Sequence, residues 1–99
     1  MTISKTIENG KLILALDGKL SVSTAPQLQE ALLPAFDEAK DIVLDCAKLT
    51  YVSSAGLRVL LIGHEAAQAK DAKMTLSGVS EKVMETLEMT GFTNVLAIE

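Results

Sequence analysis

Two adjacent serines, Ser53 and Ser54, lie where a hydroxyl group could do chemistry. The segment Ile42–Cys46 ahead of them is apolar except for Asp45 and predicts a buried strand, and the run from about Ala55 to Lys70 predicts a helix. The serines therefore fall at the junction of a strand with the N-terminus of a helix, where the helix dipole favours negative charge. A hydroxyl at this position could cap the helix, act as a nucleophile or accept a phosphate group.

The surrounding sequence disfavours a nucleophilic serine. Ser54 and Gly56 match the second half of the G-x-S-x-G elbow of α/β hydrolases, but Val52 stands where the first glycine is required. The lone histidine, His64, lies about two and a half turns further along the same predicted helix, too far to return as a base. No P-loop, G-x-G-x-x-G motif or metal-ligand spacing occurs in the chain. We therefore expect a protein that is not an enzyme, with no catalytic residues, no cofactor and no metal.

The cap and the phosphate acceptor both remain open for the serines. An N-cap hydroxyl accepts a hydrogen bond from an amide of the first turn and contributes about 1 kcal/mol, and either serine could provide it. Ala55 and Gly56 keep bulk away from the junction, which would leave the first helical turn open to another protein. Glycine in a helix costs about 1 kcal/mol relative to alanine. Either close packing or the approach of a partner must therefore account for Gly56.

Composition limits the class of protein. The chain has 99 residues, 48% of them hydrophobic and 22% charged, which fits one globular domain over residues 1–99. A net charge of −4 argues against direct nucleic-acid binding, which needs a basic surface. Cys46 is the single cysteine and is predicted to be a core residue. Without a signal-peptide pattern or an apolar run of roughly 20 residues, we expect a cytoplasmic protein that does not contact membranes. We expect so small an acidic domain to be a monomer.

The N-terminal half predicts a hairpin, a helix and a buried strand. Asn9-Gly10 favours a tight turn between strands near Thr2–Ile7 and Leu12–Leu16, the second of which Asp17-Gly18 would end. A helix would follow, capped by Ser23 or Thr24, and Pro34 would kink or shorten it. After the strand that ends at Cys46, the residues Ala47–Val52 are predicted to be a connection.

The C-terminal half predicts two strands and a second capped helix. A short strand covers Lys73–Ser77, Ser80 caps a helix that Gly91 ends, and a last strand covers Val95–Ile98. In the helix after the serines, we expect Leu57, Leu60 and Leu61 to be core. The order β-β-α-β-α-β-α-β predicts a single α/β domain, a mixed β-sheet with helices packed on it and right-handed crossovers.

Three segments resemble the STAS domain family and, within it, the bacterial anti-sigma factor antagonists. Asp45–Leu61 (DCAKLTYVSSAGLRVLL) is similar to the signature strand, loop and helix start of the family. Leu12–Leu20 with Ser23–Leu28 resembles its second strand and first helix, and Gly78–Phe92 resembles its last helix and the turn after it.

The resemblance implies roles for several polar residues around the junction. It makes Ser54, two residues before Gly56, the phosphorylation site, with Ser53 as the alternative acceptor. Family members often carry aspartate at the positions of Ser53 and Ser21. Asp45 matches the acidic residue at the strand end, although a surface carboxylate or a loop cap would fit it equally well.

The resemblance also implies a partner switch. The unmodified protein would bind an anti-sigma factor that is also a serine kinase and so release a sigma factor. Phosphorylation would end that binding, and a metal-dependent serine phosphatase would restore it. The expected partner-binding residues are Ser21, Ser23, Thr24, Asp45, Ser53, Ala55, Gly56 and Arg58. Arg58 would pair with a partner carboxylate or the Ser54 phosphate, unless it is an ordinary solvated residue. The alternative is a non-switching STAS module, a scaffold or transport accessory, which binds its partner whether or not Ser54 is modified.

Overall fold

Five strands form one sheet in the order β1-β2-β3-β4-β5, as a computed structural model that describes residues 1–99 shows. Only β1 and β2 are antiparallel, and the other neighbours are parallel, which confirms the predicted mixed sheet. The elements along the chain are β1 (Thr2–Glu8), β2 (Lys11–Leu20), α1 (Ala25–Ala35), β3 (Asp41–Val52), α2 (Ser54–Ala69), β4 (Lys73–Ser77), α3 (Glu81–Met89), the short 3₁₀ helix η1 (Phe92–Asn94) and β5 (Ala97–Ile98).

The predicted hairpin turn joins β1 to β2. Asn9 and Gly10 have φ angles of 52° and 81°, the left-handed conformation that a tight hairpin turn requires. The turn places Glu8 opposite Lys11 and continues as a seven-residue antiparallel ladder.

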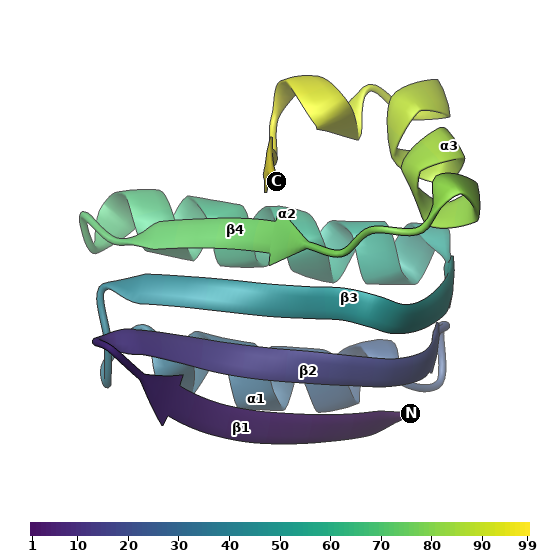
Figure 1. Cartoon of the computed structure of the whole chain (residues 1–99). Coiled ribbons are helices and arrows are strands. Elements are labelled where there is room, and N and C mark those ends of the chain that lie inside the picture. The colour runs from purple at the N-terminus through teal and green to yellow at the C-terminus, as the bar shows by residue number, and fades with distance from the viewer.

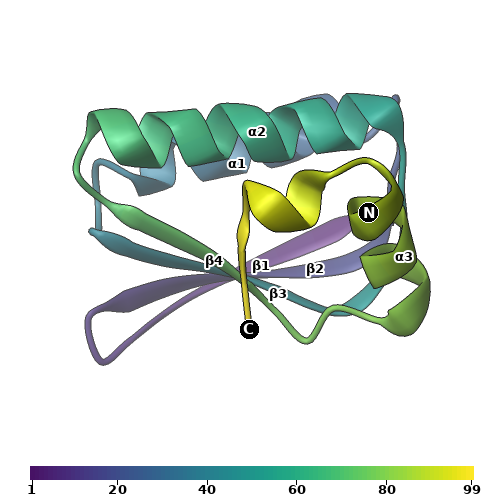
Figure 2. The same ribbon diagram turned by 90° about the horizontal axis from the view of Figure 1, so that it is seen from above.

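Both long helices cover the same face of the sheet. From β2 to β4, each parallel strand is added on the same side of the one before it. Right-handed crossovers that step in one direction place their helices on one face. Figure 1 accordingly shows α1 and α2 behind the sheet, and Figure 2 shows both helices above it. The opposite face of β1, β2 and β3 carries no helix.

The core lies between this sheet and the two helices and is almost entirely aliphatic. The twelve largest fully buried side chains are eleven leucines and one isoleucine: Leu12, Leu14, Leu16, Leu20, Leu28, Leu32, Ile42, Leu44, Leu49, Leu60, Leu76 and Leu87. Cys46 is buried with them, as predicted, and so is Leu57, whereas Leu61 is only half-buried.

Two strands are longer than the sequence predicts. Asp17-Gly18 does not end β2, which continues to Leu20, and the predicted connection Ala47–Val52 belongs to β3. Register shifts explain the error: from the Ala15–Asp45 pair to the end of the ladder, β3 uses two more residues than β2. These bulges break the alternation of buried and exposed residues while the strands stay paired. Both strands therefore reach the serines.

Three smaller boundaries also differ. The helix after the serines begins at Ser54 rather than Ala55, and the last strand is only Ala97–Ile98. Pro34 lies in the last turn of α1, which ends one residue later, so the proline neither divides the helix nor shortens it much. Ser80 caps α3 as predicted, with its Oγ 3.2 Å from the Val83 nitrogen, and Gly91 follows that helix with φ 79°.

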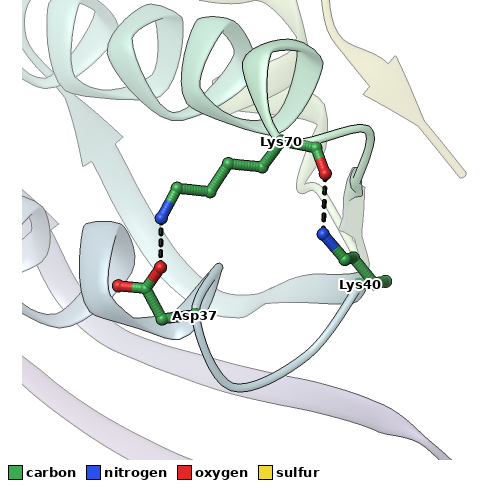
Figure 3. Close-up of polar contacts among 3 residues, drawn as sticks. All are labelled: Asp37, Lys40 and Lys70. Carbon is green, nitrogen blue, oxygen red and sulfur yellow. Dashed lines mark hydrogen bonds and ion pairs between the residues drawn. The ribbon is translucent and has the colours of Figure 1, made fainter.

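Polar contacts tie the α1–β3 loop to the C-terminus of α2 (Figure 3). The ammonium group of Lys40 donates to the carbonyl oxygen of Lys70 at 2.8 Å, and Lys70 in turn forms an ion pair with Asp37. A cation at a helix C-terminus is favourable. These contacts lie at the opposite end of α2 from Ser54. No helix in the structure combines the length and apolarity needed to span a bilayer.

Replacing Thr75 with valine is expected to stabilise the fold. Thr75 is 3% exposed, and its hydroxyl has no hydrogen-bond partner. An unsatisfied buried hydroxyl costs about 1–3 kcal/mol, so Thr75→Val should raise the free energy of unfolding by about 1 kcal/mol, measured by urea denaturation. Thr24→Val is the contrast. The Thr24 hydroxyl donates a hydrogen bond to the Lys19 carbonyl oxygen at 2.7 Å, so removing it should lower the free energy of unfolding. Equal losses in both variants would contradict this reading of Thr75.

Candidate functional site

Ser53, not Ser54, caps α2. Ser53 has extended backbone angles, and its Oγ accepts a hydrogen bond from the Gly56 N–H, with 3.1 Å between the two heavy atoms. Its backbone N–H donates to the Leu20 carbonyl oxygen at 2.8 Å. The half-buried Ser53 is thus occupied at both its hydroxyl and its amide, which resolves the choice of cap that the sequence left open.

Ser54 is the first residue of α2 and is exposed. The cap does not use its hydroxyl, and no acidic residue occurs in the first turn of the helix. A negative charge added to Ser54 would therefore meet the positive end of the helix dipole without an opposing carboxylate in that turn.

Close packing accounts for Gly56. A Cβ at this position would lie 2.6 Å from the Leu20 Cγ and 2.9 Å from the Leu20 carbonyl oxygen. Gly56 is buried, so its contribution is to let the first turn of α2 approach the end of β2. The structure therefore supports close packing, rather than the approach of a partner, as the reason for a glycine here.

Replacing Gly56 with alanine is expected to destabilise the protein although alanine favours helices by about 1 kcal/mol. The contact with the Leu20 carbonyl is to backbone, which cannot rotate away, and overpacking of this kind costs about 1–3 kcal/mol. We expect a net loss of about 1–2 kcal/mol in urea denaturation. In a double-mutant cycle with Leu20→Ala, the two losses should sum to more than the loss in the double variant. Strict additivity, or a gain in stability from Gly56→Ala, would contradict the packing explanation.

Hydrogen bonds hold the loop after β2 in one conformation. The Thr24 hydroxyl accepts from the Ser21 N–H at 2.8 Å and donates to the Lys19 carbonyl oxygen at 2.7 Å. The hydroxyls of Ser21 and Ser23 lie 3.0 Å apart. The prediction that Ser23 or Thr24 caps α1 is wrong: Thr24 is the N-cap residue by position, but its side chain bonds within the loop. The Ser21 carbonyl oxygen instead accepts the Ala25 N–H at 2.8 Å.

The structure brings most, but not all, of the expected site residues together. Leu20 contacts both Ser53 and Gly56, so the loop that follows it lies beside the first turn of α2. Ala55 is half-buried and Arg58 is exposed on the same helix. Asp45 is elsewhere: it lies within β3, not at its end, and its carboxylate accepts the Ala47 N–H at 3.0 Å. This contact is a local backbone cap at the bulge.

Two exposed apolar side chains near Ser54 were not singled out from the sequence. Val22, in the loop after β2, is 75% exposed, and Tyr51, opposite Lys19 near the end of β3, is 44% exposed. Val22 could have been identified from the sequence, because an apolar residue between two serines of a polar loop is expected to be exposed. Tyr51 could not be identified because its segment was predicted to be a connection rather than a strand.

The lone histidine lies far from the exposed surface around Ser54. His64 is the tenth residue after Ser54 in α2, about 15 Å further along the helix axis. Nowhere do three His, Cys, Asp or Glu side chains gather as they would around a metal ion. What the site presents is an exposed hydroxyl at a helix N-terminus, beside a loop fixed by hydrogen bonds.

Known proteins share both the sequence pattern and the fold. The family model for the STAS domain matches residues 2–99. A Bordetella bronchiseptica protein whose name describes it as the anti-sigma factor antagonist BtrV is 32% identical over 91 residues, which cover 91% of this chain and 78% of that protein.

Solved structures extend the comparison. A structure described as an anti-sigma factor antagonist of Thermotoga maritima has a TM-score of 0.88 at 17% identity and covers 97% of this chain and 84% of its own. The Bacillus cell fate determinant SpoIIAA in its phosphorylated form has a TM-score of 0.74 at 14% identity, covering 99% and 91%. At these identities the structures show a shared fold, and the match of the family model over residues 2–99 shows that the chain belongs to the STAS domain family.

Proposed function

We propose that this protein is an anti-sigma factor antagonist that works as a phosphorylation-controlled partner switch. In its unmodified form it binds an anti-sigma factor that is also a serine kinase, and a sigma factor is released. Phosphorylation of Ser54 by that kinase ends the binding, and a metal-dependent serine phosphatase restores it. The protein is the substrate of the kinase and has no catalytic role.

One observation carries the proposal: of the two serines at the junction, only Ser54 is exposed and has a hydroxyl that the helix cap does not use. Ser53 is half-buried and holds the cap with its hydroxyl, whereas Ser54 is exposed. The names of relatives such as BtrV support the class of partner, and the phosphorylated form of SpoIIAA, whose fold is shared, supports the modification.

Phosphate on Ser54 is compatible with the folded state. It adds about −1.5 to −2 charge and three acceptor oxygens. At the N-terminus of α2 the dipole contributes about 0.3–1 kcal/mol in its favour when exposed. Arg58, one turn further on, carries the nearest positive charge on the same helix. The modification therefore acts on the surface that it occupies and leaves the domain folded.

The partner surface in this proposal is the junction itself. It consists of the loop residues Ser21, Val22, Ser23 and Thr24, the exposed Tyr51, and Ser54, Ala55 and Arg58 of α2. Tyr51 is the aromatic anchor, because tyrosine is enriched among the residues that dominate binding energy, and the exposed Val22 adds apolar area for a partner to bury. Gly56 acts indirectly by holding the loop against α2.

A kinase assay tests which serine accepts the phosphate. The chain is incubated with ATP and each anti-sigma kinase encoded in the same genome, and the intact mass is recorded. We expect one added phosphate in the wild type and in Ser53→Ala, and none in Ser54→Ala. Ser80→Ala is the matched control, since Ser80 caps α3 in the same way that Ser53 caps α2.

The same assay separates the alternatives. The switch is supported if Ser53→Ala gains a phosphate, Ser54→Ala does not, and the phosphorylated protein no longer binds the kinase. Phosphate that persists in Ser54→Ala and is lost in Ser53→Ala would assign the acceptor to Ser53. Binding that is equal before and after phosphorylation would indicate the non-switching scaffold instead.

A further inference from the structure

The face of the sheet that faces away from α1 and α2 carries an ordered row of charges. At the hairpin end, the cross-strand register places Glu8 of β1, Lys11 of β2, Asp41 of β3 and Lys73 of β4 side by side. The signs alternate across four strands. Figure 1 is drawn from this side, with the helices behind the strands, and we call this surface the bare face.

The charged side chains of this row form no ion pair within the chain. The structure has two ion pairs, Lys5–Glu38 and Lys70–Asp37, and neither lies in the row. Towards the other end of the bare face a second pair of charges occurs with the signs reversed, Asp17 on β2 opposite Lys48 on β3.

Between the two charged ends of the sheet lies a row of aliphatic side chains and threonines. The register aligns Thr6, Ile13, Val43, Thr75 and Ala97 across all five strands. Ile13 and Val43, on the two central strands, are half-buried although no helix covers them. The bare face therefore has an apolar centre with a charged row towards each end, which is the pattern of an interface core and its rim.

We propose that the bare face is a self-association surface, on which a second copy of this chain docks face to face about a two-fold axis parallel to the strands. An axis between β2 and β3 places each β2 over the partner's β3. Lys11 then faces the partner's Asp41, and Asp17 faces the partner's Lys48. Under this one two-fold rotation, each charge of the row and of the Asp17–Lys48 pair faces an opposite charge on the partner.

The same axis brings the apolar centres together. Ile13 lies over the partner's Val43, and both side chains are half-buried in the single chain. Sheets that pack face to face are rotated by about 30°, so pairs near the axis stay in register and the outer Glu8–Lys73 pairs diverge. Stable interfaces bury about 800 Å² on each partner, roughly a seventh of the 5411 Å² surface of this chain. The dimer leaves Ser54 and the first turn of α2 open, and it would replace the monomer expected from the sequence.

Charge complementation between two variants tests the proposal. Lys11→Glu places a carboxylate opposite the partner's Asp41 twice in the dimer, and Asp41→Lys places two lysines opposite each other twice. Sedimentation velocity at low salt is run up to about 1 mM protein, where an association of about −4 kcal/mol becomes visible. We expect wild type to dimerise in the micromolar range and each variant to associate at least tenfold more weakly.

An equimolar mixture of the two variants is the decisive arm. In the mixed dimer every changed charge faces an opposite one, so association should return to the wild-type level, which also shows that both variants are folded. Lys82→Glu and Glu81→Lys on the exposed surface of α3 are the controls, because they change net charge equally away from the bare face. A wild type that stays monomeric, a dimer that is indifferent to both variants, or a mixture without recovery would each overturn the proposal.

Discussion

A chain phosphorylated on Ser54 is expected to bind its anti-sigma factor about a thousandfold more weakly than the unmodified chain. An interface that closes over a neutral, exposed hydroxyl must desolvate the new phosphate or hold it against the partner's carboxylates. A penalty of about 4 kcal/mol at the interface corresponds to that factor. Isothermal titration calorimetry of the anti-sigma factor with each form measures it directly.

Two variants test whether the charge causes the loss. Ser54→Ala should bind as tightly as unmodified protein and should not respond to incubation with kinase and ATP. Ser54→Asp carries less charge and fewer acceptor oxygens than a phosphoserine, so we expect a smaller loss than the phosphate produces. An affinity that changes less than tenfold on phosphorylation would show that the charge on Ser54 does not control the interface.

The stability of the protein is expected to fall steeply in alkali because of one buried thiol. Burial, with a smaller contribution from the charge of Asp45, raises the pKa of Cys46 from 9.0 to about 12. Between these values the unfolded thiol has lost its proton and the folded thiol keeps it. Unfolding therefore releases a proton, and stability falls as the pH rises, by about 1.4 kcal/mol for each pH unit. The contribution is fully present below pH 9.

Cys46→Ala isolates this effect. The variant loses packing at every pH, but its stability should lack the additional decline, because tyrosine and lysine titrations are common to both proteins. Urea denaturation from about pH 8 to about pH 11 should therefore show the two stabilities converging by about 2–3 kcal/mol. Parallel curves over this range would show that the Cys46 thiol ionises as easily in the folded protein as in the unfolded chain.

Local signals in the sequence were sufficient for the order of the elements. The Asn9-Gly10 turn, the Ser80 cap and Gly91 after α3 each depend on residues a few positions apart, and all three are where the sequence predicts. The strands Ile42–Cys46 and Lys73–Ser77 were found because their apolar residues are contiguous or alternate.

Features that depend on distant contacts were not predictable in the same way. The end of β3 contains exposed Thr50 and Tyr51, which resemble a loop, and only pairing with β2 through two register shifts keeps it a strand. The choice between Ser53 and Ser54 as the cap depends on where that strand ends, to within one residue. The role of Gly56 depends on Leu20, which is 36 residues earlier in the chain.

The position of the candidate site follows from these long strands. Because β2 and β3 both reach the junction, the Ser53 amide bonds the end of β2 and the loop after it is held by Thr24. The surface around Ser54 is thus held in place within the chain itself, and we expect a phosphate on Ser54 to change its charge rather than its shape.

The most direct test of this account is a comparison of ¹H–¹⁵N NMR spectra of the protein before and after phosphorylation by its kinase. We predict large shifts confined to the loop Ser21–Thr24 and the first turn of α2, with no change at the backbone amides of those β2, β3 and β4 residues whose side chains pack against α1 and α2. Shifts spread across the sheet would mean that phosphorylation refolds the domain, and would contradict a local switch at Ser54.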